Sequence, residues 1–120
     1  MLLALALQVA AVTIPSPPFD WSGLPPLRVP RAEASASVAD FVRDEVRAGR
    51  CAAPQHDSLA VDLAVYVTGD GKVRRIVPRA INCPTVEQYA SGIALRTIRG
   101  KIEPPEDAGW HRMAVTFAWQ

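Results

Sequence analysis

The sequence has no excess of charge of either sign. It carries 13 Lys and Arg residues against 12 Asp and Glu residues, which leaves a formal net charge of +1. Proteins that bind nucleic acid or an anionic membrane surface usually carry a strongly basic face. Aromatic residues make up only 7% of the chain and do not alternate with basic residues along a groove. We therefore predict no nucleic-acid partner.

Signatures of catalysis and of metal binding are also missing. The chain contains no G-x-S-x-G, no H-E-x-x-H, no glycine-rich phosphate loop and no Cys-His signature. His56 and Asp57 are neighbours in sequence, which is no evidence of a catalytic dyad. A zinc site built from the two histidines and two cysteines would lack the usual paired spacing. We predict a protein that is not an enzyme, with no cofactor and no metal.

Charge is absent from the first 19 residues. Residues 1–14 read MLLALALQVAAVTI. This run is too short for a membrane-spanning helix, which needs about 20 apolar residues. It fits the apolar region of a signal peptide, which needs about 7–15. No Lys or Arg precedes the run, so the signal is atypical or the true start lies upstream. We predict an exported, periplasmic protein that contacts a membrane only if this segment stays uncleaved; the alternative is a buried apolar strand or helix.

Cysteine is scarce, with Cys51 and Cys83 as the only two. An even count in a small exported chain predicts a disulfide. Closing a loop of this length would stabilise the fold by roughly 3–4 kcal/mol in the chain-entropy model. The alternative is two unrelated buried thiols.

Proline is concentrated in one stretch, with six residues between Pro15 and Pro30. We interpret residues 15–32 as a linker or as an arm that lies on the domain. Residues 33–120 then form the single folded domain. Four apolar residues of the stretch could pack on this domain: Phe19, Trp21, Leu24 and Leu27.

Two segments have the apolar spacing of helices. Residues 35–50 carry one apolar stripe, with Ser35 or Ser37 as the N-cap. Residues 85–99 carry a second stripe, with Thr85 as the N-cap. Gly92 lies in the middle of the second helix, at a cost near 1 kcal/mol. We interpret it as allowing close contact with a sheet.

Three segments alternate as strands do: residues 59–68, 72–81 and 113–119. Gly69, Asp70 and Gly71 supply the positive-φ positions of a tight hairpin between the first two. The alternation of the second strand slips near Arg74 and Arg75, which predicts a bulge there.

The order helix, strand, strand, helix, strand predicts an α+β fold. The second helix is a crossover, so the third strand runs parallel to the second. Placing it beside the first strand gives a three-stranded antiparallel sheet in the order 2-1-3, with both helices packed on one face. The second and third strands are then the edges of the sheet.

The two edges differ in charge. The second strand carries basic residues and Pro78, which discourage pairing with another chain. The third strand has no charged residue between Met113 and Trp119. Such an edge binds an extended peptide by strand addition, or is covered by the N-terminal arm or a second copy.

From these residues the chain resembles the TonB C-terminal domain family. The stretches that carry the resemblance are VDLAVYVTGDGKVRRIVPRA, SGIALRTIRGKIEPP and HRMAVTFAW. They hold a D-G-x-V hairpin, a basic amphipathic helix that leads into a proline, and a final alternating strand. Ile102 stands where the family often has Trp or Tyr. The chain departs from the full-length transducer because it lacks a long periplasmic spacer and a convincing membrane span.

The resemblance implies a periplasmic domain of Gram-negative bacteria. In the family, the last strand pairs with the TonB box of an outer-membrane transporter, in transport across the outer membrane. Transferred to this chain, the partner-binding edge strand is expected to be Arg112, Met113, Ala114, Val115, Thr116 and Phe117, acting mainly through backbone groups. The alternative is a structural envelope protein that forms a homodimer through the same strand.

Overall fold

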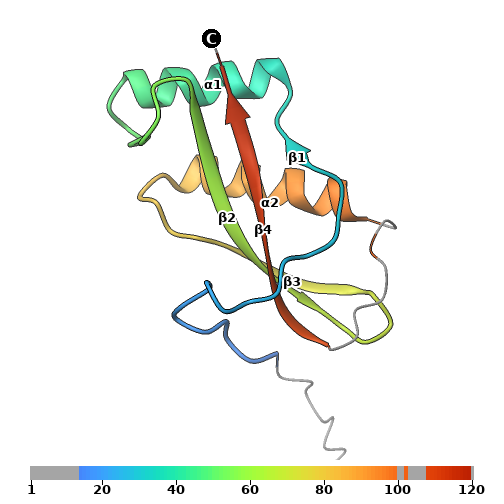
Figure 1. Cartoon of the computed structure of the whole chain (residues 1–120). Coiled ribbons are helices and arrows are strands. Elements are labelled where there is room, and N and C mark those ends of the chain that lie inside the picture. The colour runs from blue at the N-terminus through green and yellow to red at the C-terminus, as the bar shows by residue number, and fades with distance from the viewer. Residues whose placement is uncertain (1–13, 100–101, 103–107, 120) are drawn as a thin grey trace, which may run out of the picture.

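A computed structural model describes residues 14–99, 102 and 108–119 of the chain (Figure 1). Nearly all of the signal-peptide-like segment, Met1 to Thr13, lies outside the described residues. Among those that are described, no helix combines the length and the apolarity needed to cross a membrane.

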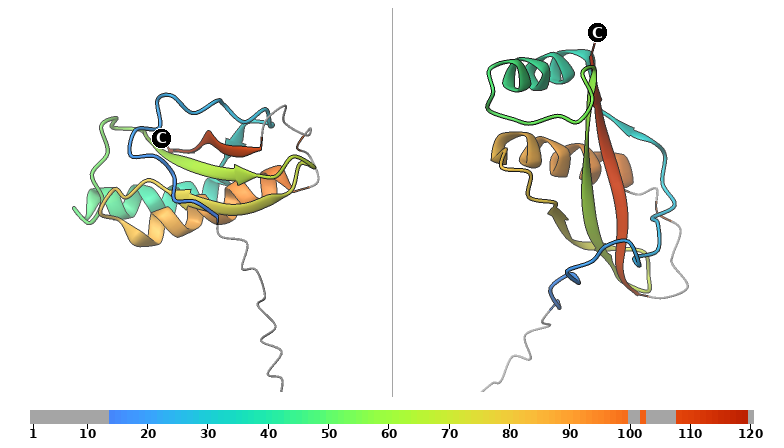
Figure 2. Two further views of the ribbon diagram at one scale, coloured as in Figure 1. Left: turned by 90° about the horizontal axis from the view of Figure 1, so that it is seen from below. Right: turned by 60° about the vertical axis from the view of Figure 1, so that its left-hand side comes forward.

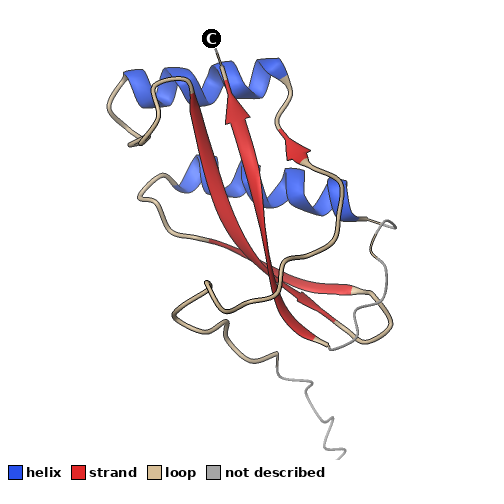
Figure 3. Ribbon diagram, viewed as in Figure 1, coloured by secondary structure: helices blue, strands red, loops and turns tan. Residues whose placement is uncertain are grey.

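Two helices and four strands make up the described fold. In chain order they are β1 (Ala32–Glu33), α1 (Ala36–Arg47), β2 (Ser58–Val67), β3 (Val73–Pro78), α2 (Pro84–Ile98) and β4 (Gly109–Ala118). The fold is α+β, and Figure 3 shows long strands against two helices, with the Pro-rich stretch drawn as loop up to β1. β4 begins four residues before the strand predicted from alternation, because Gly109 to Arg112 also pair with β2.

The prediction of a three-stranded antiparallel sheet is wrong. The sheet is mixed and has four strands, in the order β1-β4-β2-β3. β2 pairs antiparallel with both β3 and β4, whereas β1 pairs parallel with β4. The fourth strand was missed because it is only two residues long and therefore has no alternation to detect. Its pairing depends on the position of β4, which is more than 70 residues away in sequence.

The core lies on one face of the sheet, between the strands and both helices (Figure 2). Alternate residues of β2 and β4 point to this face, and Val61, Val65, Val115 and Phe117 are completely buried there. The opposite face carries Asp62 and the alternate residues next to it. Neither of the two described helices covers this second face; the N-terminal arm crosses part of it instead (Figure 1).

The two helices begin in different ways. Ser35 caps α1, and its hydroxyl accepts a hydrogen bond from the backbone N–H of Val38 at 3.4 Å. α2 begins earlier than predicted, with Cys83 rather than Thr85 at the N-cap and Pro84 at the first position. Proline suits this position because its fixed φ is already helical and its missing N–H would have no helical partner.

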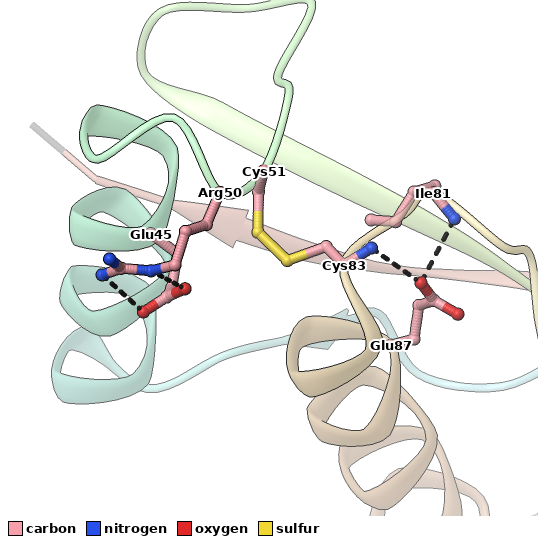
Figure 4. Close-up of a disulfide and its surroundings, with 6 residues drawn as sticks. All are labelled: Glu45, Arg50, Cys51, Ile81, Cys83 and Glu87. Atoms are coloured by element: carbon pink, nitrogen blue, oxygen red, sulfur yellow. Dashed lines mark hydrogen bonds and ion pairs between the residues drawn. A yellow bond between two sulfur atoms is a disulfide. The ribbon is translucent and has the colours of Figure 1, made fainter.

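Cys51 and Cys83 form a disulfide that joins the segment after α1 to the start of α2 (Figure 4). Their Cα atoms are 5.4 Å apart, and both residues are buried. Beside the disulfide, the Glu87 carboxylate accepts backbone N–H bonds from Cys83 at 3.0 Å and Ile81 at 3.2 Å. Glu87 therefore caps α2 from within its first turn, a role for which Cys83 has no suitable side chain.

Gly69, Asp70 and Gly71 form the connection between β2 and β3. The N–H of Thr68 donates to the carbonyl of Lys72 at 2.9 Å, and Gly71 has a φ of 81°. The Thr68 hydroxyl also donates to Asp70, which holds the pKa of that carboxyl below its usual range. In β3, Arg75 pairs with Tyr66 and Val73 pairs with the next residue, Val67, so Arg74 has no partner in β2. The irregularity lies where the slipping alternation predicted a bulge.

Candidate protein-binding edge

The outer edge of β4 has a fixed set of outward backbone groups. In an antiparallel pair, alternate residues direct their N–H and C=O groups to the same side of the strand. The Arg112 N–H donates to the carbonyl of Pro25 at 2.9 Å, and the Arg112 carbonyl accepts from Leu27 at 2.8 Å. Arg112 therefore faces away from β2. Ala114 and Thr116 must face the same way.

The N-terminal arm pairs with this edge at two separate places. The first is the parallel bridge between Pro26 and Arg112. The second is β1, where Ala32 is opposite Val115 and Glu33 is opposite Thr116. Just after β1, the N–H of Ala34 donates to the Thr116 carbonyl at 3.0 Å. The arm thus occupies the position that an added strand would take.

Between these two places the arm leaves the edge. It advances from Pro26 to Ala32 while β4 advances only from Arg112 to Val115. The arm has six residues here against three in β4, so it cannot follow the strand. The register of β1 directs the Ala32 N–H to the Ala114 carbonyl, whereas among the described residues the N–H of Ala114 has no backbone partner. The ladder along β4 is therefore interrupted at its middle.

A cavity of about 600 Å³ lies where the arm leaves the edge. Its walls come from the arm and from the open face of the sheet. The arm contributes mainly apolar residues, which include Trp21, Pro26, Leu27, Val29 and Pro30. The sheet contributes Asp62, Arg112, Ala114 and Thr116, and Arg79 lies just after β3.

Charges on the cavity wall are partly paired. The Arg79 guanidinium lies 3.8 Å from the Asp62 carboxylate and 4.5 Å from the centre of the Trp21 ring. Backbone and side-chain hydrogen bonds from Ser22 hold the pKa of Asp20 below its usual range, and the charge of Arg79 adds to this effect. Within the described ranges, Arg112 has no carboxylate within ion-pair distance. Among the described residues that line this cavity, Arg112 is thus the arginine without an ion-pair partner.

The predicted edge residues divide into two groups in the structure. Arg112, Ala114 and Thr116 direct backbone groups outward. Met113, Val115 and Phe117 direct them to β2, and Val115 and Phe117 are buried core residues. The sequence therefore located the strand but not which half of its residues can pair with a partner. Cover of this edge by the N-terminal arm was one of the alternatives expected from the sequence, but which arm residues pair with β4 was not predicted; the sequence signal for them was the Pro-rich stretch with its apolar residues.

The two histidines come from different segments, and neither lines the cavity at this edge, although His111 belongs to β4. His111 is buried on the helix side of the sheet, where its Nδ1 lies 3.0 Å from the Gly109 carbonyl oxygen. The His56 carbonyl accepts a hydrogen bond from the Trp119 indole at 3.1 Å, in the segment before β2. Among the residues with described positions, no group of three His, Cys, Asp or Glu side chains could hold a metal ion.

Comparisons with known proteins returned no match: no family model, no curated protein and no solved structure is significantly similar to this chain.

Proposed function

We propose that this protein is a binding module of the bacterial envelope that pairs an extended segment of a partner protein with the outer edge of β4. The observation that carries the proposal is the incomplete cover of that edge by the arm. An extended segment already lies there, so the edge can pair with one, yet among the described residues the N–H of Ala114 is left without a backbone partner.

The arm is a weak competitor for the edge. It runs parallel to β4, and parallel pairs are slightly less stable per residue than antiparallel ones. An antiparallel segment could pair with Arg112, Ala114 and Thr116 in succession. Each hydrogen bond contributes a net of only about 0.5–1.5 kcal/mol. A partner segment that forms more hydrogen bonds to β4 than the arm does could therefore replace the arm, even though each single bond contributes little free energy.

The class of partner is proposed from the sequence. The apolar N-terminal segment and the disulfide are typical of an exported protein, and the resemblance to the TonB C-terminal domain adds the periplasm of a Gram-negative cell. The proposed partner is a segment of an outer-membrane transporter that resembles a TonB box. Self-association through β4 is the competing function, because the arm of a second copy has the same chemistry as the arm seen here.

Photo-crosslinking in the native host tests the proposal. A photoreactive amino acid at Thr116 lies on the outer edge, whereas one at the exposed Leu95 of α2 serves as the control on the helix side. We expect adducts from position 116 to an extended segment of an outer-membrane protein, and none of these from position 95. The adducts should disappear when Ala114→Pro removes the outward N–H.

Other outcomes contradict the proposal. Adducts from position 116 only to residues of the same arm would show that the arm is permanent edge protection. Adducts to a second copy of the chain would favour the structural, self-associating protein.

A further inference from the structure

The N-terminal arm contacts the sheet at a point far from the edge that it covers. The Trp21 ring lies over the Arg79 guanidinium, with 4.5 Å between Cζ of Arg79 and the ring centre. Arg79 follows β3, and β2 separates β3 from β4. The arm therefore crosses the open face of the sheet between Arg79 and the outer edge of β4 (Figure 1).

Arg79 is a firm base for this contact because it is fixed to the sheet. Its backbone N–H donates to the Asp62 carbonyl at 2.8 Å, which continues the pairing of β3 with β2. Its guanidinium lies 3.8 Å from the Asp62 carboxylate. Neither contact involves the arm, so Arg79 keeps its place on the sheet when the arm moves.

Trp21 is held in position by turns within the arm. The Ser22 N–H donates to the Asp20 carboxylate at 2.9 Å, and the Leu24 N–H donates to the Trp21 carbonyl at 3.0 Å. Asp favours such turns because its side-chain oxygen can accept a hydrogen bond from the backbone two residues later. By contrast, the Phe19 side chain in the same part of the arm is fully exposed to solvent.

Between Trp21 and the edge of β4, the arm does not pack closely on the sheet. The cavity of about 600 Å³ lies there, and its lining includes Trp21, Arg79 and Arg112. An empty space supplies few van der Waals contacts, so this part of the arm depends on the Trp21 contact and on the hydrogen bonds to Arg112. At its C-terminal end the arm continues into β1 and α1. Release from the other end therefore breaks the Trp21 contact before the bonds to Arg112.

We propose that the contact between Trp21 and Arg79 is an autoinhibitory latch, which holds the arm over the edge of β4 and limits the access of a partner strand. This inference rests on the proposed function, because strand addition needs the edge that the arm covers. The apparent affinity of a partner that binds only the released form is proportional to the released fraction. Loss of the latch should therefore increase arm opening and partner binding by the same factor.

Amide hydrogen exchange of the full chain, followed by NMR, measures the latch without a partner. Trp21→Ala and Arg79→Gln each remove the contact. We expect the N–H groups of Leu27 and Arg112, which join the arm to β4, to exchange about fivefold faster in both variants. The double variant should exchange about as fast as either single variant, since one contact can be lost only once.

Two matched controls accompany these variants. Phe19→Ala removes an exposed aromatic ring from the same arm, and Arg75→Gln removes an arginine from the same face of β3, outside the cavity. Neither should change the exchange rates. Unchanged exchange in Trp21→Ala, or an equal acceleration in Phe19→Ala, would overturn the latch. This test stands even if Arg79→Gln disturbs the sheet, because Trp21 belongs to the arm.

Photo-crosslinking from position 116 in the native host then tests the inhibition of partner binding. We expect the yield of adducts with an outer-membrane protein to rise about fivefold in Trp21→Ala and to stay unchanged in Phe19→Ala. Faster exchange with no rise in the yield of these adducts would overturn the autoinhibition. Faster exchange without any partner adducts would overturn the function proposed above, whereas adducts with unchanged exchange would overturn only the latch.

Discussion

Gly92 lies in the middle of α2 on an exposed side of the helix, not against the sheet as we predicted from the sequence. A Cβ added there would meet no atom within 4 Å. Glycine costs about 0.5–1 kcal/mol relative to alanine inside a helix. We therefore expect Gly92→Ala to raise the free energy of unfolding by about this amount, measured by urea denaturation.

Gly49 is the matched contrast for that substitution. It follows α1 with a φ of 76°, and a Cβ would also have open space there. Because this backbone conformation is unfavourable for a side chain, Gly49→Ala should lower stability by about 1 kcal/mol. Equal effects of the two alanines would contradict the account, since both sites have space and differ only in conformation.

Glu87 is the second prediction at the scale of single residues. Its carboxylate accepts the N–H groups of Ile81 and Cys83 at the start of α2. Glu87→Ala leaves both donors without this acceptor, so we expect a loss of about 1–2 kcal/mol in urea denaturation. Glu87→Gln keeps one acceptor oxygen and should lose less. Gln88→Ala, next to it on the exposed surface, should change stability by under about 0.5 kcal/mol; a loss as large as that at Glu87 would refute the capping role.

The N-cap of α1 could be predicted from the local sequence, whereas that of α2 could not. Ser35 was one of two candidates, with Ser37, because a serine immediately before an apolar stripe is a direct signal, and the structure selects Ser35. Thr85 was the wrong choice for α2, since Pro84 allows the helix to start one residue earlier and Glu87 supplies the cap from inside. A cap made by a later side chain depends on the path of the preceding loop, which local sequence does not specify.

The disulfide acts at the scale of elements, because it ties the loop after α1 to the start of α2. The two cysteines are 32 residues apart in sequence. Constraining a loop of this size in the unfolded chain contributes about 3–4 kcal/mol. The double variant Cys51→Ala/Cys83→Ala should lose this amount in urea denaturation. Reductant should destabilise the parent to a similar degree and leave the double variant unchanged; a parent that is insensitive to reductant would contradict the prediction.

Proline substitutions distinguish the two sides of β4. The N–H of Ala114 faces the arm and has no described partner, so Ala114→Pro should leave the fold intact. Val115 is fully buried and its N–H faces β2, so Val115→Pro should cost about 3 kcal/mol or more. Circular dichroism and urea denaturation compare the two variants. Unfolding by Ala114→Pro would show that the assigned direction of the β4 backbone groups is wrong.

Long elements were predictable and short ones were not. β2 and both helices have enough residues for a clear period, and each begins within one residue of the expected start. β1 has two residues, and only its hydrogen bonds to β4 make it a strand. The same reason explains why the site was predicted only in part. The sequence located β4, but the cover of its edge and the cavity arise from contacts between segments far apart in the chain.

The arm and the sheet together decide what the whole molecule can bind. With the arm seated, β4 has a covered edge and a cavity lined by Arg112 and Ala114. With the arm released, the same edge offers the outward groups of three residues to a partner strand. The proposed strand addition therefore depends on whether the arm can leave while the rest of the sheet stays paired.

Native-state amide hydrogen exchange measures this directly. The N–H groups of Leu27 and Arg112 join the arm to β4, whereas those of Val61 and Val115 join β4 to β2. If the arm opens locally, the first pair should exchange much faster than the second, and only the second should follow global unfolding in urea. Exchange of Leu27 and Arg112 at the slow, globally limited rate of Val61 and Val115 would show that the arm never leaves the folded protein, and it would contradict strand addition at β4.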